Sequence, residues 1–183
     1  MRSGKPIASV VATRQAAARG QTKPKPNHQI AILGSIFLVA LAVRIAVAHQ
    51  LGNEPLYRSP QLDSLEYFNW ATRLLQDPWW WPARPSHSPG YPYWLAGWLA
   101  LGHGSLLVVR IAQASVGAIT AVLGSRIAWR LAGETAGIVA GLSLALCGPL
   151  VWIDTSILAE GPLLALLAAA LAVWMGAGAE APP

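Results

Sequence analysis

The chain has 183 residues, of which 54% are hydrophobic and only 11% are charged, and its formal net charge is +5. This composition is typical of membrane proteins and argues against a single soluble domain, because the apolar residues fall in blocks close to the thickness of a bilayer. The single cysteine, Cys147, lies in an apolar run, which excludes a disulfide framework and a metal site of paired cysteines.

The N-terminal tail, residues 1–29, carries much of the positive charge. It contains six lysines and arginines and no acidic residue. No aromatic side chains are interleaved with them to stack on bases, so we expect no nucleic-acid partner. A basic flank before an apolar run is instead typical of a segment that stays in the cytoplasm. We therefore expect a disordered cytoplasmic tail.

Residues 30–48, IAILGSIFLVALAVRIAVA, predict the first membrane span, because they are mostly apolar and about as long as a bilayer requires. Arg44 lies near enough to the end of this span for its side chain to reach the interface. A cleaved signal peptide is the alternative, since residues 46–48 fit a small-x-small cleavage pattern. The long basic flank and the further apolar runs favour a retained span.

Three more apolar stretches predict spans at residues 105–125, 136–152 and 161–175, which makes about four in all, before a short tail at 177–183. Arg126 and Arg130 follow the second span and should face the cytoplasm. The N-terminus is then inside, and residues 49–104 and the turn at 154–160 are outside.

Glycines at positions 133, 137 and 141 repeat at four-residue spacing and leave bare backbone where another helix can approach closely. The ordinary glycine content of membrane helices explains the repeat equally well. If the repeat is functional, it offers a face for a partner membrane subunit.

Residues 91–101, YPYWLAGWLAL, are apolar but too short to cross a bilayer. We interpret them as an interfacial or re-entrant helix whose aromatic side chains are membrane anchors: Tyr91, Tyr93, Trp94 and Trp98. Counting this segment as a full span would reverse the topology and place the arginines after the second span outside.

A short helix is also predicted earlier in the outer loop. Ser59 and Pro60 are typical of a helix start, and Asp77 before Pro78 is typical of a helix end. We therefore expect about four helical turns beside the membrane.

Asp63, Glu66, Tyr67 and Trp70 have the spacing of one face of this helix. The opposite apolar face can then rest on the membrane. Asp63 followed three residues later by Glu66 also resembles a capping box, in which both carboxylates would only stabilise the helix start. Spacing alone leaves both interpretations open.

The stretch PARPSHSPGYP cannot form regular structure, because it is rich in proline and glycine. It places Arg84, Ser86, His87 and Ser88 close to the membrane. A hydrolase triad of Ser86 or Ser88 with His87 and Asp63 is disfavoured, since adjacent serine and histidine rarely point at each other and no nucleophile elbow is present.

The order of these features resembles the N-terminal part of the GT-C membrane glycosyltransferases, close to the protein O-mannosyltransferase-like and aminoarabinose-transferase-like group. The resemblance covers residues 30–175 and rests on LDSLEYFNWATRLL, SPGYPYWLAGWLALG, VVRIAQASVGAITAVLGSRIAWRLAG and GPLVWIDTSILAEGPLLALL. It implies an all-α integral membrane module with a GT-C-like fold. It also implies transfer of a sugar from a polyprenyl-phosphate carrier to an acceptor outside the cytoplasm.

The resemblance also implies site residues. An essential acidic residue in the first outer loop matches Asp63, and a second in the next outer turn matches Glu160 better than Asp154. Ser64 stands where the protein mannosyltransferases have a second acidic residue, which departs from that branch. We expect support from Glu66, Tyr67, His87 and Asp154.

Sugar transfer needs a carboxylate to accept the hydroxyl proton and positive charge to stabilise the departing phosphate. Arg58, Arg84 or His87 could hold that phosphate, and a divalent cation could bridge Asp63 and Glu160. Arg58 and Arg84 serve equally well as interfacial anchors.

We expect a multi-pass protein of a bacterial cytoplasmic membrane, in contact with lipid and with a lipid-linked sugar donor. Members of the family are longer and have more spans, so the chain is expected to be a truncated product, one piece of a split enzyme or a noncatalytic remnant. The missing spans or another membrane subunit would then be its partner. The alternative function is a noncatalytic multispanning subunit of a larger envelope-assembly complex.

Overall fold

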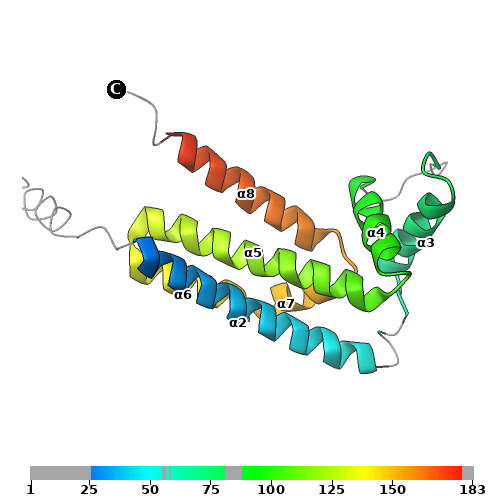
Figure 1. The fold of residues 1–183 in the computed structure, drawn as a ribbon, viewed down its shortest axis with the longest axis horizontal. Coiled ribbons are helices and arrows are strands. Elements are labelled where there is room, and N and C mark those ends of the chain that lie inside the picture. The colour runs from blue at the N-terminus through cyan, green and yellow to red at the C-terminus, as the bar shows by residue number, and fades with distance from the viewer. Residues whose placement is uncertain (1–25, 55–56, 58, 81–87, 179–183) are drawn as a thin grey trace, which may run out of the picture. The chain divides into compact units, whose positions relative to one another are not determined.

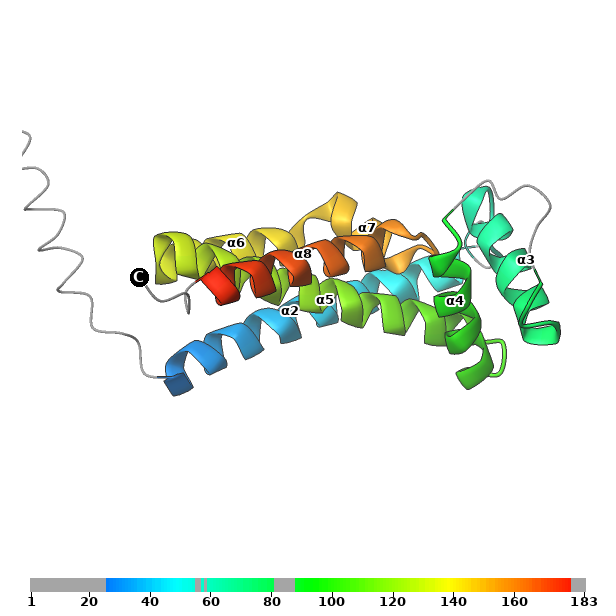
Figure 2. The ribbon, with the colours of Figure 1, turned by 90° about the horizontal axis from the view of Figure 1, so that it is seen from above.

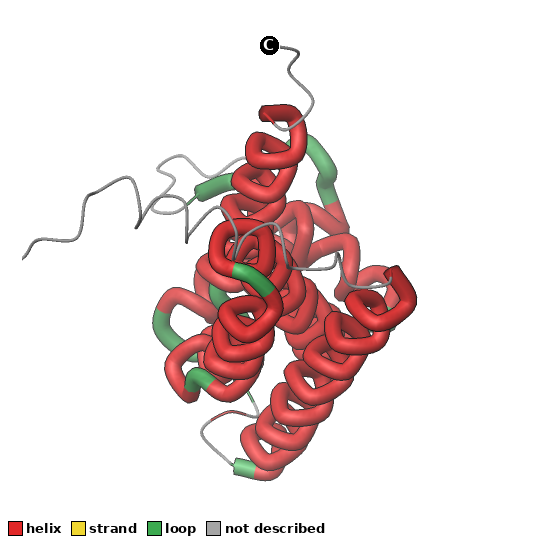
Figure 3. The backbone as a smooth tube through the Cα atoms, turned by 90° about the vertical axis from the view of Figure 1, so that its left-hand side faces the viewer, coloured by secondary structure: helices red, strands yellow, loops and turns green. Residues whose placement is uncertain are grey.

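The computed structural model describes residues 26–54, 57, 59–80 and 88–178, which form seven helices and no strand. The all-helical prediction is confirmed for this part of the chain (Figure 3). The helices are α2 (Pro26–Asn53), α3 (Asp63–Gln76), α4 (Gly90–Leu101), α5 (Leu106–Ala132), α6 (Glu134–Leu146), α7 (Gly148–Thr155) and α8 (Glu160–Gly178). Met1–Ala31 and Ile32–Pro183 are two separate units, and the contacts below lie within the second.

Two helices are long and apolar enough to cross a membrane, and they correspond to the first two predicted spans. They are Asn27–Asn53 in α2 and Leu106–Ala132, the whole of α5, with 27 residues each. Helix α5 is central, because it packs against α6, α7 and α8 (Figure 1). It also contacts α2 through a small core in which Ile36 and Ala40 meet Ala118 and Ala121. The membrane prediction is supported by these lengths and compositions.

The predicted span at 136–152 is not one continuous helix. Helices α6 and α7 are bent by 54° at a break around Cys147, and only together do they reach a crossing length. Pro149 lies in the first turn of α7 and has no backbone N–H, so it cannot continue the hydrogen bonds of α6. The predicted span at 136–152 therefore corresponds to a bent pair of helices, and whether the pair crosses the membrane stays a prediction.

The predicted fourth span is a helix that packs along α5 (Figure 2). Its apolar part, Glu160–Gly176, is shorter than α2 and α5. By length and composition the described residues therefore contain two membrane-crossing helices, or three if α6 and α7 form one bent span. A count of four stays a prediction.

The glycine repeat lies inside the chain's own packing. Gly137 and Gly141 are buried, and Oγ of Ser125 on α5 donates a 2.8 Å hydrogen bond to the Gly137 carbonyl. A Cβ at Gly141 would overlap Ile36 and Ser125. The expected close approach of another helix is therefore made by α5 and α2, so these two glycines do not form a free face for a partner subunit.

Helices α3 and α4 pack on each other, and α4 also contacts α5. Tyr67, Trp70 and Leu74 of α3 share a core with residues of α4, notably Tyr91 and Leu95. The short helix expected at 91–101 is confirmed as α4, but Tyr91 is only 6% exposed and is a core residue instead of a membrane anchor.

Helix α3 begins later than the sequence suggested. It starts at Asp63 instead of Ser59, and the residue before it, Leu62, has a positive φ of 52° and provides no side-chain cap. Asp63 is therefore the first helical residue, one position after the cap position that a capping box would give it. The predicted stop is confirmed: Asp77 follows the last helical residue, and its Oδ1 accepts a 3.1 Å hydrogen bond from the backbone N–H of Trp79.

Candidate functional site

A pocket of about 350 Å³ lies where α3, α5 and the α7–α8 turn meet. Figure 1 shows α3, α4 and the α7–α8 turn at the same end of α5. The volume is in the range of small-ligand sites. The pocket is lined by Tyr57, residues 59–64, Arg110, Trp152, residues 156–158 and Glu160.

Asp63 and Glu160, the two acidic residues expected to be catalytic, both line this pocket. Both side chains are exposed, and each is the first residue of its helix. The fold thus brings together the two predicted outer segments, as a shared site requires. A carboxylate in the first turn also stabilises a helix through its dipole, so a helix-start role would explain the same placement.

Tyr67 links these carboxylates electrostatically. Burial raises the pKa of its hydroxyl, and the negative charges of Glu160, Asp63 and Glu66 raise it further. Three carboxylates therefore lie within range of one phenol. The direction of this shift means that Tyr67 stays protonated to a higher pH than an exposed tyrosine would. Tyr67 and Trp70 pack inward, whereas Glu66 stays exposed, so the predicted shared face is divided between core and solvent.

Arg110 is a pocket residue that the sequence interpretation did not select. It is only 8% exposed, and its Nη2 donates to the Tyr57 carbonyl. Its Nε is buried with no hydrogen-bond partner, as is Oγ of Ser156, another residue of the pocket lining. Among the described residues no carboxylate forms an ion pair with Arg110. The available signal was an arginine inside an apolar span, which usually marks a functional position.

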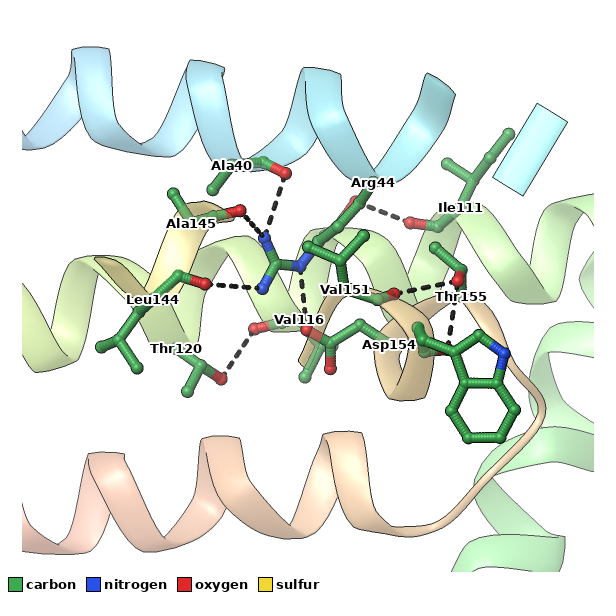
Figure 4. Close-up of polar contacts among 12 residues, drawn as sticks. Ala40, Arg44, Ile111, Val116, Thr120, Leu144, Ala145, Val151, Asp154 and Thr155 are labelled. Carbon is green, nitrogen blue, oxygen red and sulfur yellow. Dashed lines mark hydrogen bonds and ion pairs between the residues drawn. The ribbon is translucent and has the colours of Figure 1, made fainter. Parts of the chain in front are cut away.

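Asp154, expected to support the site, does not line the pocket. Its Oδ2 accepts a 2.8 Å hydrogen bond from Nε of Arg44 in α2 (Figure 4). Arg44 is 1% exposed, so the prediction that it reaches the membrane interface is wrong. A side chain of α2 therefore helps to build the interior, which favours retention of the first span over cleavage.

Three predicted phosphate-binding residues, Arg58, Arg84 and His87, lie outside the described residues. Within the described ranges, no group of three or more His, Cys, Asp or Glu side chains is placed to hold a metal ion. Asp63 and Glu160 would supply two carboxylates to a cation.

No protein-family model matches the chain, and neither a curated protein nor a solved structure is significantly similar to it.

Proposed function

We propose that this chain forms part of a membrane glycosyltransferase, which transfers a sugar from a polyprenyl-phosphate donor to a hydroxyl acceptor at the outer membrane face. One observation carries the proposal: Asp63, Glu160 and Arg110 line the same pocket at one end of the spanning helices. A lipid-linked donor needs such a place, because its lipid stays in the bilayer while its head group reacts beside it.

In the proposed reaction the acceptor oxygen forms a bond to the anomeric carbon as the bond from that carbon to the phosphate oxygen breaks. Asp63 accepts the proton of the attacking hydroxyl. The phosphate leaves with its bonding electrons and gains negative charge, which Arg110 stabilises by hydrogen bonds from its guanidinium. Glu160 faces the same space and would orient the acceptor or share the proton.

Arg110 suits the phosphate role for a physical reason. A buried guanidinium with an unpartnered Nε and no carboxylate paired to it among the described residues leaves its charge uncompensated. An anionic ligand would compensate that charge and use the free donor. If a divalent cation binds at this pocket, Asp63 and Glu160 would hold it and it would supply positive charge to the donor phosphate.

The test measures transfer of radiolabelled sugar from a polyprenyl-phosphate donor in native membranes, which retain any other membrane segments of the enzyme. Asp63→Asn keeps the size of the side chain, and we expect transfer to fall by at least ~10²-fold, the lower end of what a positioned proton acceptor contributes. Glu160→Gln should lower transfer as well if the second outer turn completes the site.

Asp77→Asn is the matched control, because the side-chain oxygen of Asn can still accept the hydrogen bond from Trp79. Its activity should stay within a few-fold of the wild type. Protein levels are compared by immunoblot. Full transfer by Asp63→Asn at normal expression would show that this carboxylate is only a helix-start residue.

A noncatalytic membrane subunit is the second candidate, and the exposure of α2 favours it. Only 17% of the apolar window of this helix is buried, against 44% for α5. Exposed apolar side chains such as Leu38 and Val39 would suit other membrane helices as well as lipid. If Asp63→Asn and Glu160→Gln both retain full transfer, this function replaces the enzymatic one.

A further inference from the structure

The break between α6 and α7 removes backbone hydrogen bonds at a place that the chain is expected to bury in the membrane. In a continuous helix the carbonyl of Ala145 would accept from the N–H of residue 149, and that of Leu144 from residue 148. Residue 149 is proline and has no N–H. Backbone carbonyls without a partner are costly where no water can reach them.

Arg44 supplies donors to both carbonyls. Its Nη1 donates to the Ala145 carbonyl at 3.2 Å, and its Nη2 donates to the Leu144 carbonyl at 3.3 Å (Figure 4). The positive charge is also favourable at the C-terminal end of a helix. A side chain of α2 thus takes the place of the missing backbone donors of α6.

The same guanidinium is held on two other sides. Its Nη1 also donates to the Ala40 carbonyl in α2 at 3.2 Å, and its Nε donates to Oδ2 of Asp154 in α7 at 2.8 Å. Arg44 therefore connects three helices at the break. A planar group with five donors can do this, whereas an ammonium group cannot match the same geometry.

Asp154 carries this connection to the pocket. A Cβ at Gly117 of α5 would overlap the Asp154 carboxylate and Nε of Arg44, so the pair lies directly on the α5 backbone. A Cβ at Gly161 would lie 2.8 Å from Oδ1 of Asp154. Gly161 directly follows Glu160, so the carboxylate packs against the backbone that carries this pocket residue.

We propose that Arg44 is a positioning residue, which replaces the hydrogen bonds lost at the break and, through Asp154, fixes the start of α8 and hence Glu160 at the pocket. The inference rests on the proposed function only in treating Glu160 as a site residue. The role of Arg44 at the helix break does not depend on the proposed function.

The native Cys147 allows a direct test, because it lies at the break and is the only thiol in the chain. The rate of its alkylation by N-ethylmaleimide is measured on the full chain in membranes. Arg44→Met keeps the side-chain length but removes the donors. We expect alkylation to be at least ~10-fold faster, since losing hydrogen bonds to a charged group shifts a local opening equilibrium by about that factor or more.

A double variant separates this role from simple charge balance. If Arg44 only neutralises Asp154, Arg44→Met with Asp154→Leu should restore the slow wild-type rate, because a buried ion pair can often be replaced by apolar residues. If Arg44 holds the break, the double variant should stay fast. Arg44→Lys should lie between wild type and Arg44→Met, and it carries the test if Arg44→Met does not accumulate. Arg130→Met, at an exposed arginine, is the control and should leave the rate unchanged.

A wild-type alkylation rate in Arg44→Met, or in Arg44→Lys where that variant replaces it, overturns the proposal. So does full rescue by the double variant. Sugar transfer is measured in parallel. Arg44→Met should lower kcat, and Arg44→Lys should retain part of the kcat that Arg44→Met loses. If the alkylation rates change as expected while Asp63→Asn keeps full transfer, the proposed function fails but the arginine-held break does not.

Discussion

The hydroxyl of Tyr91 donates a 3.0 Å hydrogen bond to Oε1 of Gln113 in the buried interior. Nε2 of Gln113 in turn donates to the carbonyl of Leu158 at 2.9 Å. This connection joins α4, α5 and the turn that precedes Glu160. The packing of α4 and the position of the second predicted outer turn are therefore coupled through one amide side chain.

Tyr91→Phe should destabilise the protein, because it leaves Oε1 of Gln113 buried without that donor. We expect a loss of about 1–3 kcal/mol in the free energy of unfolding, measured in detergent micelles. Tyr93→Phe is the matched control on the same helix, since Tyr93 is 46% exposed, and it should change stability by less than about 0.5 kcal/mol. Equal effects of the two substitutions would contradict the buried connection.

The stability of the folded protein should fall at alkaline pH because of Tyr91. Burial, followed by the nearby Tyr67 and Glu160, raises the pKa of Tyr91 above its ordinary value of about 10. A raised pKa means that the folded state binds the proton more tightly, so this stabilisation is complete below about pH 10 and declines as pH rises above that value. Melting temperature measured from pH 7 to 11 should fall at the alkaline end. The fall should be smaller in Tyr91→Phe than in the wild type.

Arg110→Lys should both weaken binding of the donor and slow the transfer step. Lysine keeps the positive charge but loses the planar set of donors that matches a phosphate. We expect KM for the polyprenyl-phosphate sugar to rise by roughly 10-fold or more, the effect of losing a hydrogen bond to a charged group. Arg73→Lys is the control, because the Arg73 guanidinium lies over the ring of Trp80 and not in the pocket. An unchanged KM in Arg110→Lys would remove Arg110 from the proposed donor site.

The two ends of the spanning helices should face opposite sides of the membrane. In a Cys147→Ala background, a cysteine at Trp79 should react with an impermeant thiol reagent in intact cells, because that side chain is 91% exposed in the predicted outer segment. A cysteine at Ala132, exposed at the far end of α5, should react only after the cells are opened. The reverse pattern would place the pocket in the cytoplasm, away from a donor that reacts outside.

The sequence by itself determined the elements whose signals are local. Run length and hydropathy identified α2 and α5, aspartate before proline marked the end of α3, and a short apolar run between longer ones indicated α4. Each of these signals depends on residues only a few positions apart in the sequence. The local structure that it predicts is therefore independent of the tertiary fold. Pro149 is also a local signal, because proline interrupts a helix. It lies within an apolar run, and the hydropathy of that run predicted a span without a break.

Only the tertiary structure decided which distant groups meet. Arg44 pairs with Asp154 across 110 residues, and nothing near either residue in the sequence distinguishes that partner from the membrane interface. For the same reason Arg110 was recognisable as a charge in an apolar span but not as part of a pocket with Asp63 and Glu160. A buried charge must find a partner wherever the packing of the helices provides one, so its role depends on contacts that no local pattern specifies.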